Sequence, residues 1–222
     1  MTLSLHFHPF SSFCQKVLVA LYERDVPFDP VAVDLGDPVQ RAALEALWPL
    51  SKFPVLRDEA AGATVPEASL VVEYLDRFGS APPMVPAERD EALRVRLWDR
   101  VFDNYVEHPL QKAVSDNFRP AGARDPHGVA EARALLARAY RMIDDELART
   151  GADWIAGDRF TLADCGAAPA LFYANMVEPF EGHRHLAAYY ARLRARPSFA
   201  RAVDEARAFR AYFPLPWPDG WD

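Results

Sequence analysis

Two serines and a cysteine stand together at the predicted start of a helix near the N-terminus. Ser11, Ser12 and Cys14 lie in the stretch HPFSSFCQKVLVALYE, where a proline and the serines lead into an apolar-periodic helix. The first turn of a helix carries unpaired N–H groups and the positive end of the helix dipole, so it stabilises an anion held there, including a thiolate. A hydroxyl that donates a hydrogen bond to the sulfur adds to this effect. The segment therefore predicts a place where a thiolate can be held.

The same residues also have a simpler interpretation. A serine before a helix is most often an N-cap, and a cysteine there is most often a small buried side chain. The letters SSFC have the spacing of a Cys-x-x-Cys motif with Ser11 in place of the first cysteine. Dithiol exchange needs both sulfurs, so that chemistry is not expected. A lowered pKa for Cys14, in the first helical turn, stays open at this point.

The segments around these residues predict a small α/β unit. Residues 3–7 alternate between apolar and polar side chains, which indicates a strand, and residues 14–24 form an amphipathic helix. A second helix is expected at residues 37–48, with Asp37 as its N-cap and Pro38 at its first position. The remaining elements are strands at residues 28–35, 53–58 and 63–68 and a helix at residues 67–78.

The second part of the chain is predicted to be helical throughout. Residues 79–91 hold three prolines and a glycine and indicate a linker. A long helix over residues 87–117 follows, with apolar residues that include Leu93 and Leu97 at spacings of three and four. The letters TLAD predict a capping box, with Thr161 as the N-cap and Asp164 at the third helical position. Further helices are expected at residues 129–149, 160–176, 185–196 and 197–213.

Composition and charge exclude several classes of function. The 222 residues carry a formal net charge of −7, so nucleic acid and anionic membranes are not expected partners. No apolar run reaches the length of a membrane span, and the N-terminus lacks the pattern of a signal peptide. Two distant cysteines favour a reducing compartment over a disulfide framework. We therefore expect a cytoplasmic protein, and we expect no metal site.

The order of elements, together with four local sequences, resembles the cytosolic glutathione transferases of the bacterial serine type over nearly the whole chain. The resemblance implies the glutathione transferase fold: a thioredoxin-like α/β N-terminal domain, residues 1–80, and an all-α C-terminal helical domain, residues 87–222. The four sequences are PFSSFCQKVLVAL at the first helix, KFPVL at 52–56, PEASLVVEYLD at 66–76 and GDRFTLADCGAAPAL at 157–171.

The resemblance also implies residues that bind glutathione. Ser11 matches the residue that stabilises the glutathione thiolate, and the adjacent Ser12 is the alternative. Phe53 would pair its backbone with the cysteinyl part of glutathione, because the family places the following proline, here Pro54, in the cis form. Lys52 would meet the glycyl carboxylate, although a solvated surface lysine is an equally simple interpretation.

The start of the third helix departs from the family pattern. Glu67 matches the acidic residue that holds the amino group of the γ-glutamyl arm. The family usually has serine at the next position, whereas this chain has Ala68. A backbone N–H at the helix start can still bind the γ-glutamyl carboxylate, and the missing hydroxyl is expected to cost about 1–2 kcal/mol. Ser69 stands one residue late and is expected to point elsewhere.

A second substrate would lie between the two domains. The aromatic candidates for its walls are Phe10, Phe102 and Tyr105, although aromatics at helical spacing more often belong to a core. His108 is expected at the surface or at a helix end. The tail with Trp217 and Trp221 either covers the site or docks on the helical domain, and the sequence leaves both open.

The expected activity is conjugation of the glutathione thiolate, with glutathione as co-substrate, to a small apolar electrophile. The resemblance implies a homodimer in which the first domain of one subunit meets the helical domain of the other. A glutathione-dependent isomerase or dehalogenase on the same scaffold is an alternative. Ala68 favours a third hypothesis, a non-catalytic ligand-binding or stress protein.

Overall fold

A four-stranded mixed sheet forms the first part of the protein in the computed structural model, which describes residues 3–217. The strand order is β2–β1–β3–β4, with β1 parallel to β2 and antiparallel to β3. Leu5 at the centre of β1 pairs with Pro30 on one side and Leu56 on the other. The strands are β1 (Leu3–Phe7), β2 (Asp29–Ala32), β3 (Val55–Asp58) and β4 (Ala63–Pro66).

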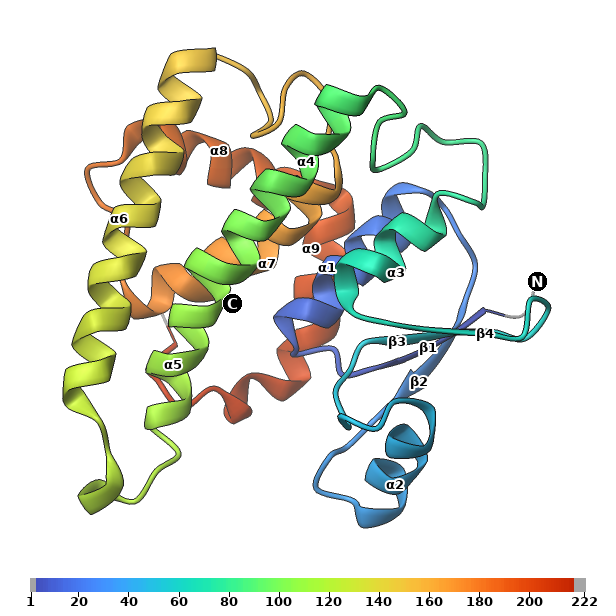
Figure 1. Cartoon of the computed structure of the whole chain (residues 1–222). Helices are drawn as coiled ribbons and strands as arrows, with labels where there is room; N and C mark the ends of the chain where they lie inside the picture. Colours follow the sequence, from blue (N-terminus) through green and yellow to red (C-terminus); the bar gives the residue numbers. More distant parts are fainter. Residues whose placement is uncertain (1–2, 218–222) are drawn as a thin grey trace.

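Helices cover both faces of this sheet, as Figure 1 shows. Helix α2 (Pro38–Leu47) lies on one face, and helices α1 (Ser12–Glu23) and α3 (Ala68–Leu75) lie on the other. Neighbouring residues of β3 point to opposite faces, so Val55 packs with α2 and Leu56 packs in the main core. This arrangement confirms the thioredoxin-like α/β domain predicted from the sequence.

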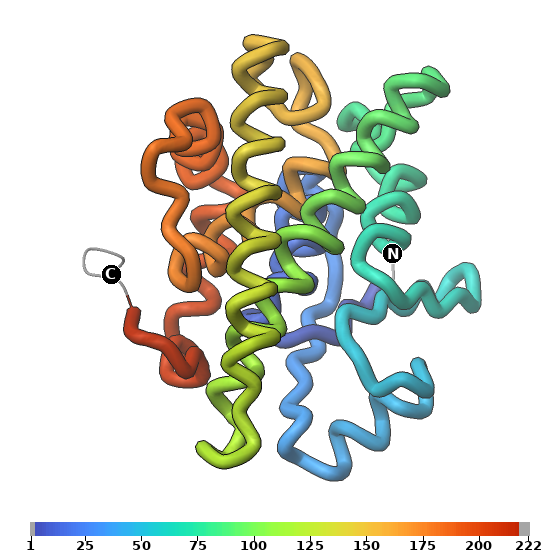
Figure 2. The backbone as a smooth tube through the Cα atoms, turned by 60° about the vertical axis from the view of Figure 1, so that its left-hand side comes forward, coloured from blue at the N-terminus to red at the C-terminus, as the bar shows by residue number. Residues whose placement is uncertain are grey.

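Helix α1 is buried on every side rather than on one face. Every side chain from Cys14 to Leu21 is at most 1% exposed, including Gln15 and Lys16. The helix packs against α3 of the first domain and against α7 and α9 of the helical domain. Figure 2 shows the same central position from a second direction.

The second part of the described chain is helical, as predicted. Asp164 accepts hydrogen bonds from the backbone N–H of Thr161 at 2.9 Å and from the Tyr189 hydroxyl at 2.6 Å, so the predicted capping box has a buried anchor. The helices are α4 (Arg89–Val101), α5 (His108–Asp116), α6 (Pro126–Thr150), α7 (Leu162–Val177), α8 (Arg184–Ala195) and α9 (Pro197–Ala206), with 3₁₀ turns at Ala121–Ala123 and Arg207–Tyr212.

The long helix predicted for residues 87–117 is interrupted by a π-helical segment, η1 (Phe102–Glu107). A π turn closes its hydrogen bonds one residue later than an α turn, so side chains after it lie in a different direction. Leu93 and Leu97 of α4, which share the predicted apolar spacing, are 68% and 57% exposed, so this spacing does not mark a buried face here. No helix within residues 3–217 is long and apolar enough to cross a bilayer.

Candidate functional site

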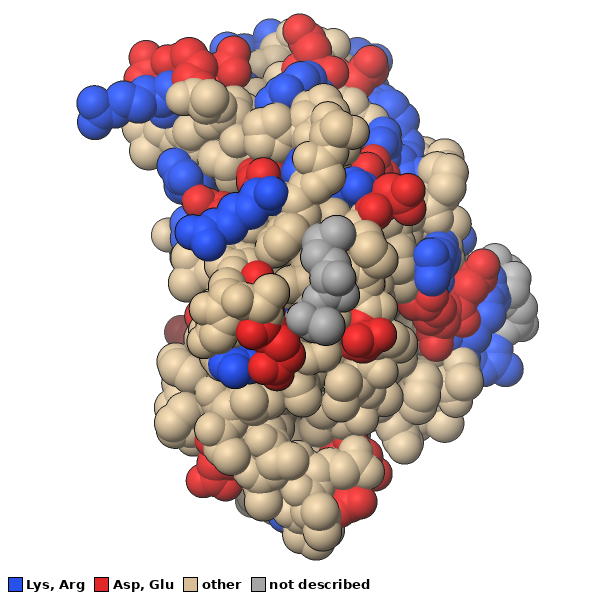
Figure 3. Space-filling view, turned by 90° about the vertical axis from the view of Figure 1, so that its right-hand side faces the viewer, with Lys and Arg blue, Asp and Glu red and all other residues tan. Residues whose placement is uncertain are grey.

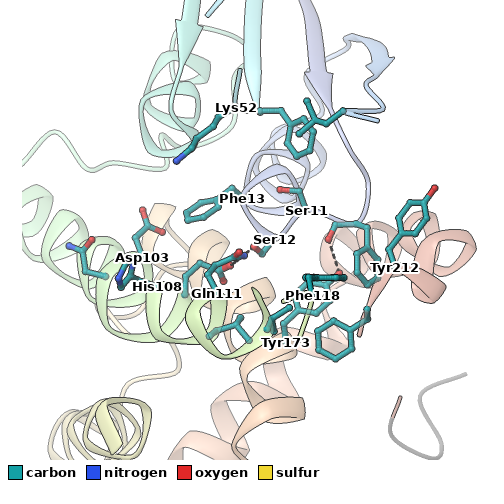
Figure 4. A pocket seen from close by; sticks show the side chains of 18 of the residues that line it. Ser11, Ser12, Phe13, Lys52, Asp103, His108, Gln111, Phe118, Tyr173 and Tyr212 are labelled. Carbon is teal, nitrogen blue, oxygen red and sulfur yellow. Dashed lines mark hydrogen bonds between the residues drawn. The ribbon is translucent and has the colours of Figure 1, made fainter. Parts of the chain in front are cut away.

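A cleft of about 680 Å³ separates the sheet from the helical domain, and it is within the size range of small-molecule sites. One side comes from the loop before α1, the residues before β3 and the start of α3. The opposite side comes from η1, α5 and the segment after α9. Figure 4 shows that Lys52, Phe13 and Ser11 lie on one side and that Asp103, His108 and Gln111 lie on the other.

Ser11 is the N-cap of α1. Its backbone is extended, and its Oγ accepts a hydrogen bond from the Cys14 N–H at 3.4 Å. The Ser11 hydroxyl also acts on the buried thiol of Cys14, which is a weak acceptor, and no oxygen or nitrogen acceptor for it is found within residues 3–217. The residue is therefore an N-cap at the edge of the cleft, a position compatible with both interpretations of the sequence.

Ser12 has a partner inside the protein. Its hydroxyl donates a 2.6 Å hydrogen bond to Oε1 of Glu107, the last residue of η1, which lies 95 positions further along the chain. The Gln111 amide donates to the same oxygen at 2.8 Å. Burial raises the pKa of Glu107, and Asp103 nearby acts in the same direction.

Cys14 carries no reactive thiolate. Its side chain is fully buried, and burial raises the pKa of its thiol to about 12, against smaller opposing effects of hydrogen bonds from Ser11 and His8. A lowered pKa for this cysteine is therefore wrong. The simpler interpretation, a small side chain in the core, describes the environment of Cys14. Its thiol stays protonated because the helix dipole does not offset the cost of removing the thiolate charge from water.

The structure brings five of the seven residues expected to bind glutathione to one cleft, whereas Pro54 and Ala68 are not among the described residues that line it. Lys52, Phe53 and Glu67 line it together with the two serines. The Phe53–Pro54 peptide bond is cis. Glu67 precedes α3 with a φ of +70°, in the left-handed region, and Ala68, the first residue of α3, is 5% exposed.

The expected electrophile walls are only partly in place. Phe10 lines the cleft and packs edge-to-face on Tyr173 at 5.4 Å between ring centroids. Phe102 is fully buried in the core and Tyr105 is 48% exposed, and neither is among the described residues that line the cleft. The π turn explains the error for Tyr105, since an α-helical period assigns it a different direction. His108, expected at the surface or a helix end, begins α5 and lines the cleft.

The tail reaches the edge of the cleft. Phe213 lines it, and the ring of Trp217 lies 6.4 Å from Phe10 and 6.1 Å from Phe213. Trp217 also packs against Phe172 of α7. The described part of the tail thus contacts both the cleft rim and the helical domain, and Trp221 lies outside the described residues.

Sequence reasoning missed the residues that hold the loop before α1. The Gln15 amide donates to the Pro9 carbonyl and to the Tyr173 hydroxyl, both at 3.0 Å. The Tyr173 hydroxyl in turn donates to the Phe10 carbonyl at 3.3 Å. These contacts fix the loop that presents Ser11. The sequence held one signal for them, a polar residue at a buried position of an otherwise apolar helix.

A buried ion pair joins α1 to α4 behind the cleft. Lys16 is 1% exposed, and its Nζ lies 2.5 Å from Asp99 and 3.0 Å from Asp103. It also donates to the Ser69 hydroxyl at 2.9 Å. Ser69 therefore points toward this cluster. This agrees with the expectation that Ser69 does not replace the family's serine at the γ-glutamyl carboxylate.

Comparisons with known proteins agree with this architecture. Models of the glutathione S-transferase N-terminal and C-terminal domains match residues 5–83 and 126–192. A glutathione S-transferase of Pseudomonas putida is 30% identical over 79% of this chain and 76% of its own length. The chain belongs to the glutathione S-transferase family. FtsZ-localized protein A of Caulobacter vibrioides, 29% identical over 88% of each chain, is also similar.

A solved structure extends the likeness to three dimensions. A glutathione S-transferase from Methylobacillus flagellatus, crystallised with GSH bound, aligns with a TM-score of 0.82 and 26% identity over 90% of this chain and 98% of its own.

No group of His, Cys, Asp and Glu side chains within residues 3–217 has an arrangement that could hold a metal ion. On the face in Figure 3, basic and acidic side chains are interspersed rather than gathered into one basic patch.

Proposed function

We propose that this member of the glutathione S-transferase family binds glutathione in the cleft and transfers its thiolate to a small apolar electrophile. The observation that carries the proposal is the Ser11 hydroxyl, which caps α1 at the edge of the cleft and has no acceptor within residues 3–217 other than the weakly accepting thiol of Cys14. A thiol held there meets a hydrogen-bond donor and the positive end of a helix, and both favour the thiolate.

Other cleft residues support binding of the whole tripeptide. The Glu67 carboxylate suits the ammonium group of the γ-glutamyl arm, and the backbone N–H groups at the start of α3 suit its carboxylate. The Phe53 backbone suits strand-like pairing with the cysteinyl residue, since it immediately precedes β3. Lys52, which lines the same cleft, suits the glycyl carboxylate.

The contacts favour Ser11 over Ser12 as the activating residue. Ser12 is engaged with Glu107 at 2.6 Å, so its proton is committed when that carboxyl is ionised. Lowering a thiol pKa by two units requires about 2.7 kcal/mol of differential interaction. The Ser11 hydroxyl and the end of α1 together are a reasonable source for part of that free energy.

The test is the absorbance of the thiolate of bound glutathione against pH, for wild type, Ser11→Ala and Ser12→Ala. We expect the wild type to lower the thiol pKa and only Ser11→Ala to restore it toward the value of free glutathione. Formation of no thiolate below the pH at which free glutathione ionises would contradict the proposal, and the non-catalytic alternative would then lead.

A homodimer is part of the proposal. Leu70 of α3 and Leu93 and Leu97 of α4 are each more than half exposed, and exposed apolar side chains that gather into a patch mark protein–protein interaction sites. Light scattering during gel filtration is expected to give twice the chain mass of 24.9 kDa. Leu93→Glu is expected to shift the mass to that of one chain, and a monomeric wild type would refute the assembly.

Two other functions are separated by simple assays. A glutathione-dependent isomerase or dehalogenase uses the same thiolate and is retained on immobilised glutathione, but it acts on other second substrates. A non-catalytic binder of unrelated ligands flows through that resin and does not turn over an aryl halide.

A cytoplasmic location stays a prediction from the sequence.

A further inference from the structure

Arg100 of α4 lines the cleft beside the start of α3, where its Nη2 contacts the Ser69 hydroxyl. Its Nε and Nη2 donate to Oδ2 of Asp99 at 3.2 Å and 2.7 Å, and Nη2 also lies 2.5 Å from Asp103. The remaining nitrogen, Nη1, has no acceptor within residues 3–217. One edge of the guanidinium is therefore fixed by the protein, whereas the two N–H donors of Nη1 are unused.

The cluster behind Arg100 holds it in one orientation. The Ser69 hydroxyl accepts a hydrogen bond from Lys16 at 2.9 Å and donates one to Asp99 at 2.8 Å. The two cations and two carboxylates of this cluster balance one another, so it is neutral as a whole. A planar guanidinium that is already held in place loses little further side-chain freedom when it binds a ligand.

Glu67 lies in the same part of the cleft and carries the opposite charge. Burial lowers the pKa of Arg100, and the charges of Asp99, Asp103 and Glu67 outweigh that effect and raise it. The Glu67 carboxylate has no hydrogen-bond partner within residues 3–217. A carboxylate next to a guanidinium, each with unused hydrogen-bonding capacity, is complementary to an α-amino acid end, which carries an ammonium group and a carboxylate on one carbon.

The start of α3 offers a ligand carboxylate no side-chain donor of its own. Ala68 has no polar side-chain atom, and the hydroxyl of Ser69 is engaged in the cluster. Only backbone N–H groups of α3 are left there. A hydrogen bond in which both partners are charged is roughly twice as strong as one between neutral groups, so a guanidinium can more than offset one absent hydroxyl.

We propose that Arg100 binds the α-carboxylate of the γ-glutamyl residue through Nη1, and that it makes the cleft specific for ligands with a complete α-amino acid end. This proposal rests on the proposed function and deepens it by naming a residue that determines ligand specificity. Because Arg100 belongs to α4, the γ-glutamyl arm would contact the helical domain as well as the first domain. Ala68 is then compensated from α4.

The experiment removes the two charged groups of the γ-glutamyl arm one at a time. Three S-methylated peptides are compared by calorimetry: S-methylglutathione, the 4-aminobutyryl-Cys-Gly analogue, which lacks the α-carboxylate, and the glutaryl-Cys-Gly analogue, which lacks the ammonium group. Methylation of the sulfur keeps the ionisation of the thiol out of the measurement. Each peptide is titrated into wild type, Arg100→Gln, Arg100→Lys and a control variant.

The matched control is Arg96→Gln. Arg96 is one turn earlier on α4, is 50% exposed where Arg100 is 51% exposed, and pairs with Glu73 through two nitrogens at 2.9 Å and 2.8 Å. It is not among the described residues that line the cleft. The control therefore removes a similar arginine and ion pair from the same helix without touching the ligand.

We expect Arg100→Gln to weaken binding of S-methylglutathione and of the glutaryl peptide about 10–100-fold alike, because both keep the carboxylate. Binding of the 4-aminobutyryl peptide should be nearly unchanged. Arg100→Lys keeps the charge but not the planar fork, so its losses should be intermediate. Arg96→Gln should leave the Kd of all three peptides unchanged.

Equal losses for the three peptides, or no loss in Arg100→Gln, would overturn the role of Arg100 and leave the proposed function intact. A wild type that binds the 4-aminobutyryl peptide as tightly as S-methylglutathione would overturn it without any variant, and so independently of folding. A wild type that binds none of the peptides refutes the proposed function itself, and the role of Arg100 with it. Thermal unfolding shows whether a variant has kept its fold.

Discussion

Replacing Lys16 by methionine is expected to destabilise the protein by about 3–5 kcal/mol, the usual cost of removing one partner of a buried ion pair. Lys16 is almost fully buried, and its ammonium group lies within 3.0 Å of carboxylate oxygens of both Asp99 and Asp103. Methionine fills similar space but leaves Asp99, 2% exposed, beside another carboxylate. Arg100 remains next to them but is itself 51% exposed, so it compensates only in part.

For a chain of this size, that loss corresponds to a fall of roughly 6–20 °C in the midpoint of thermal unfolding. The matched control is Lys112→Met, because Lys112 pairs with Asp125 at a site where the two side chains are 29% and 41% exposed. A pair exposed to this extent is worth about 0–1 kcal/mol, so the control should shift the midpoint by only a few degrees.

Urea unfolding followed by circular dichroism measures both variants under one set of conditions. A loss for Lys16→Met no greater than that of the control would refute the reasoning, since the ion pair would then contribute nothing beyond a surface pair. A second variant, Lys16→Met with Asp99→Asn, removes one stranded charge and is expected to recover part of the loss.

Three further outcomes follow from the same contacts. Asp164→Ala removes the carboxylate that accepts hydrogen bonds from the Tyr189 hydroxyl and two backbone N–H groups, and it should lower the free energy of unfolding in urea by about 3 kcal/mol or more. Asp164→Asn should lower it by less. Equal losses in the two variants would count against the hydrogen-bond argument. Ala68→Ser restores a hydroxyl at the start of α3 and should tighten glutathione binding about 5–30-fold by calorimetry, and an unchanged Kd would show that the hydroxyl has no role. Cys14 and Cys165 are fully buried and their pKa values are raised, so iodoacetamide should label neither in the native protein, and rapid labelling would disprove their inertness.

The elements that the sequence predicted well are those with a local signal. Asp37 and Pro38 define the start of α2, as their positions in the sequence indicate, and the predicted capping box begins α7. The residues around Ser11 and those before β3 were located because they form contiguous motifs. Local chemistry of this kind depends on neighbours within a few residues, which a single sequence displays directly.

The missed features depend on contacts between distant residues. The partner of Ser12 lies 95 positions away, and nothing near Glu107 in the sequence marks it as a buried residue. The π turn was missed because a period of 3.6 describes the flanking helices well, and that period led to the wrong assignment of Tyr105. The exposed leucines of α4 are a further example, since apolar periodicity alone does not distinguish a buried face of a helix from an exposed one.

Helix α1, buried on all sides, has a consequence for how the chain can be divided. Its apolar residues serve the cores of both domains at once, and Lys16 pairs with carboxylates of α4 and η1, both in the helical domain. A fragment cut at the linker before α4 would carry a solvent-exposed apolar helix with an unpaired ammonium group. The two domains, although distinct in architecture, should therefore unfold in one cooperative transition, and exchange of the helical domain between relatives should fail unless α1 is exchanged with it.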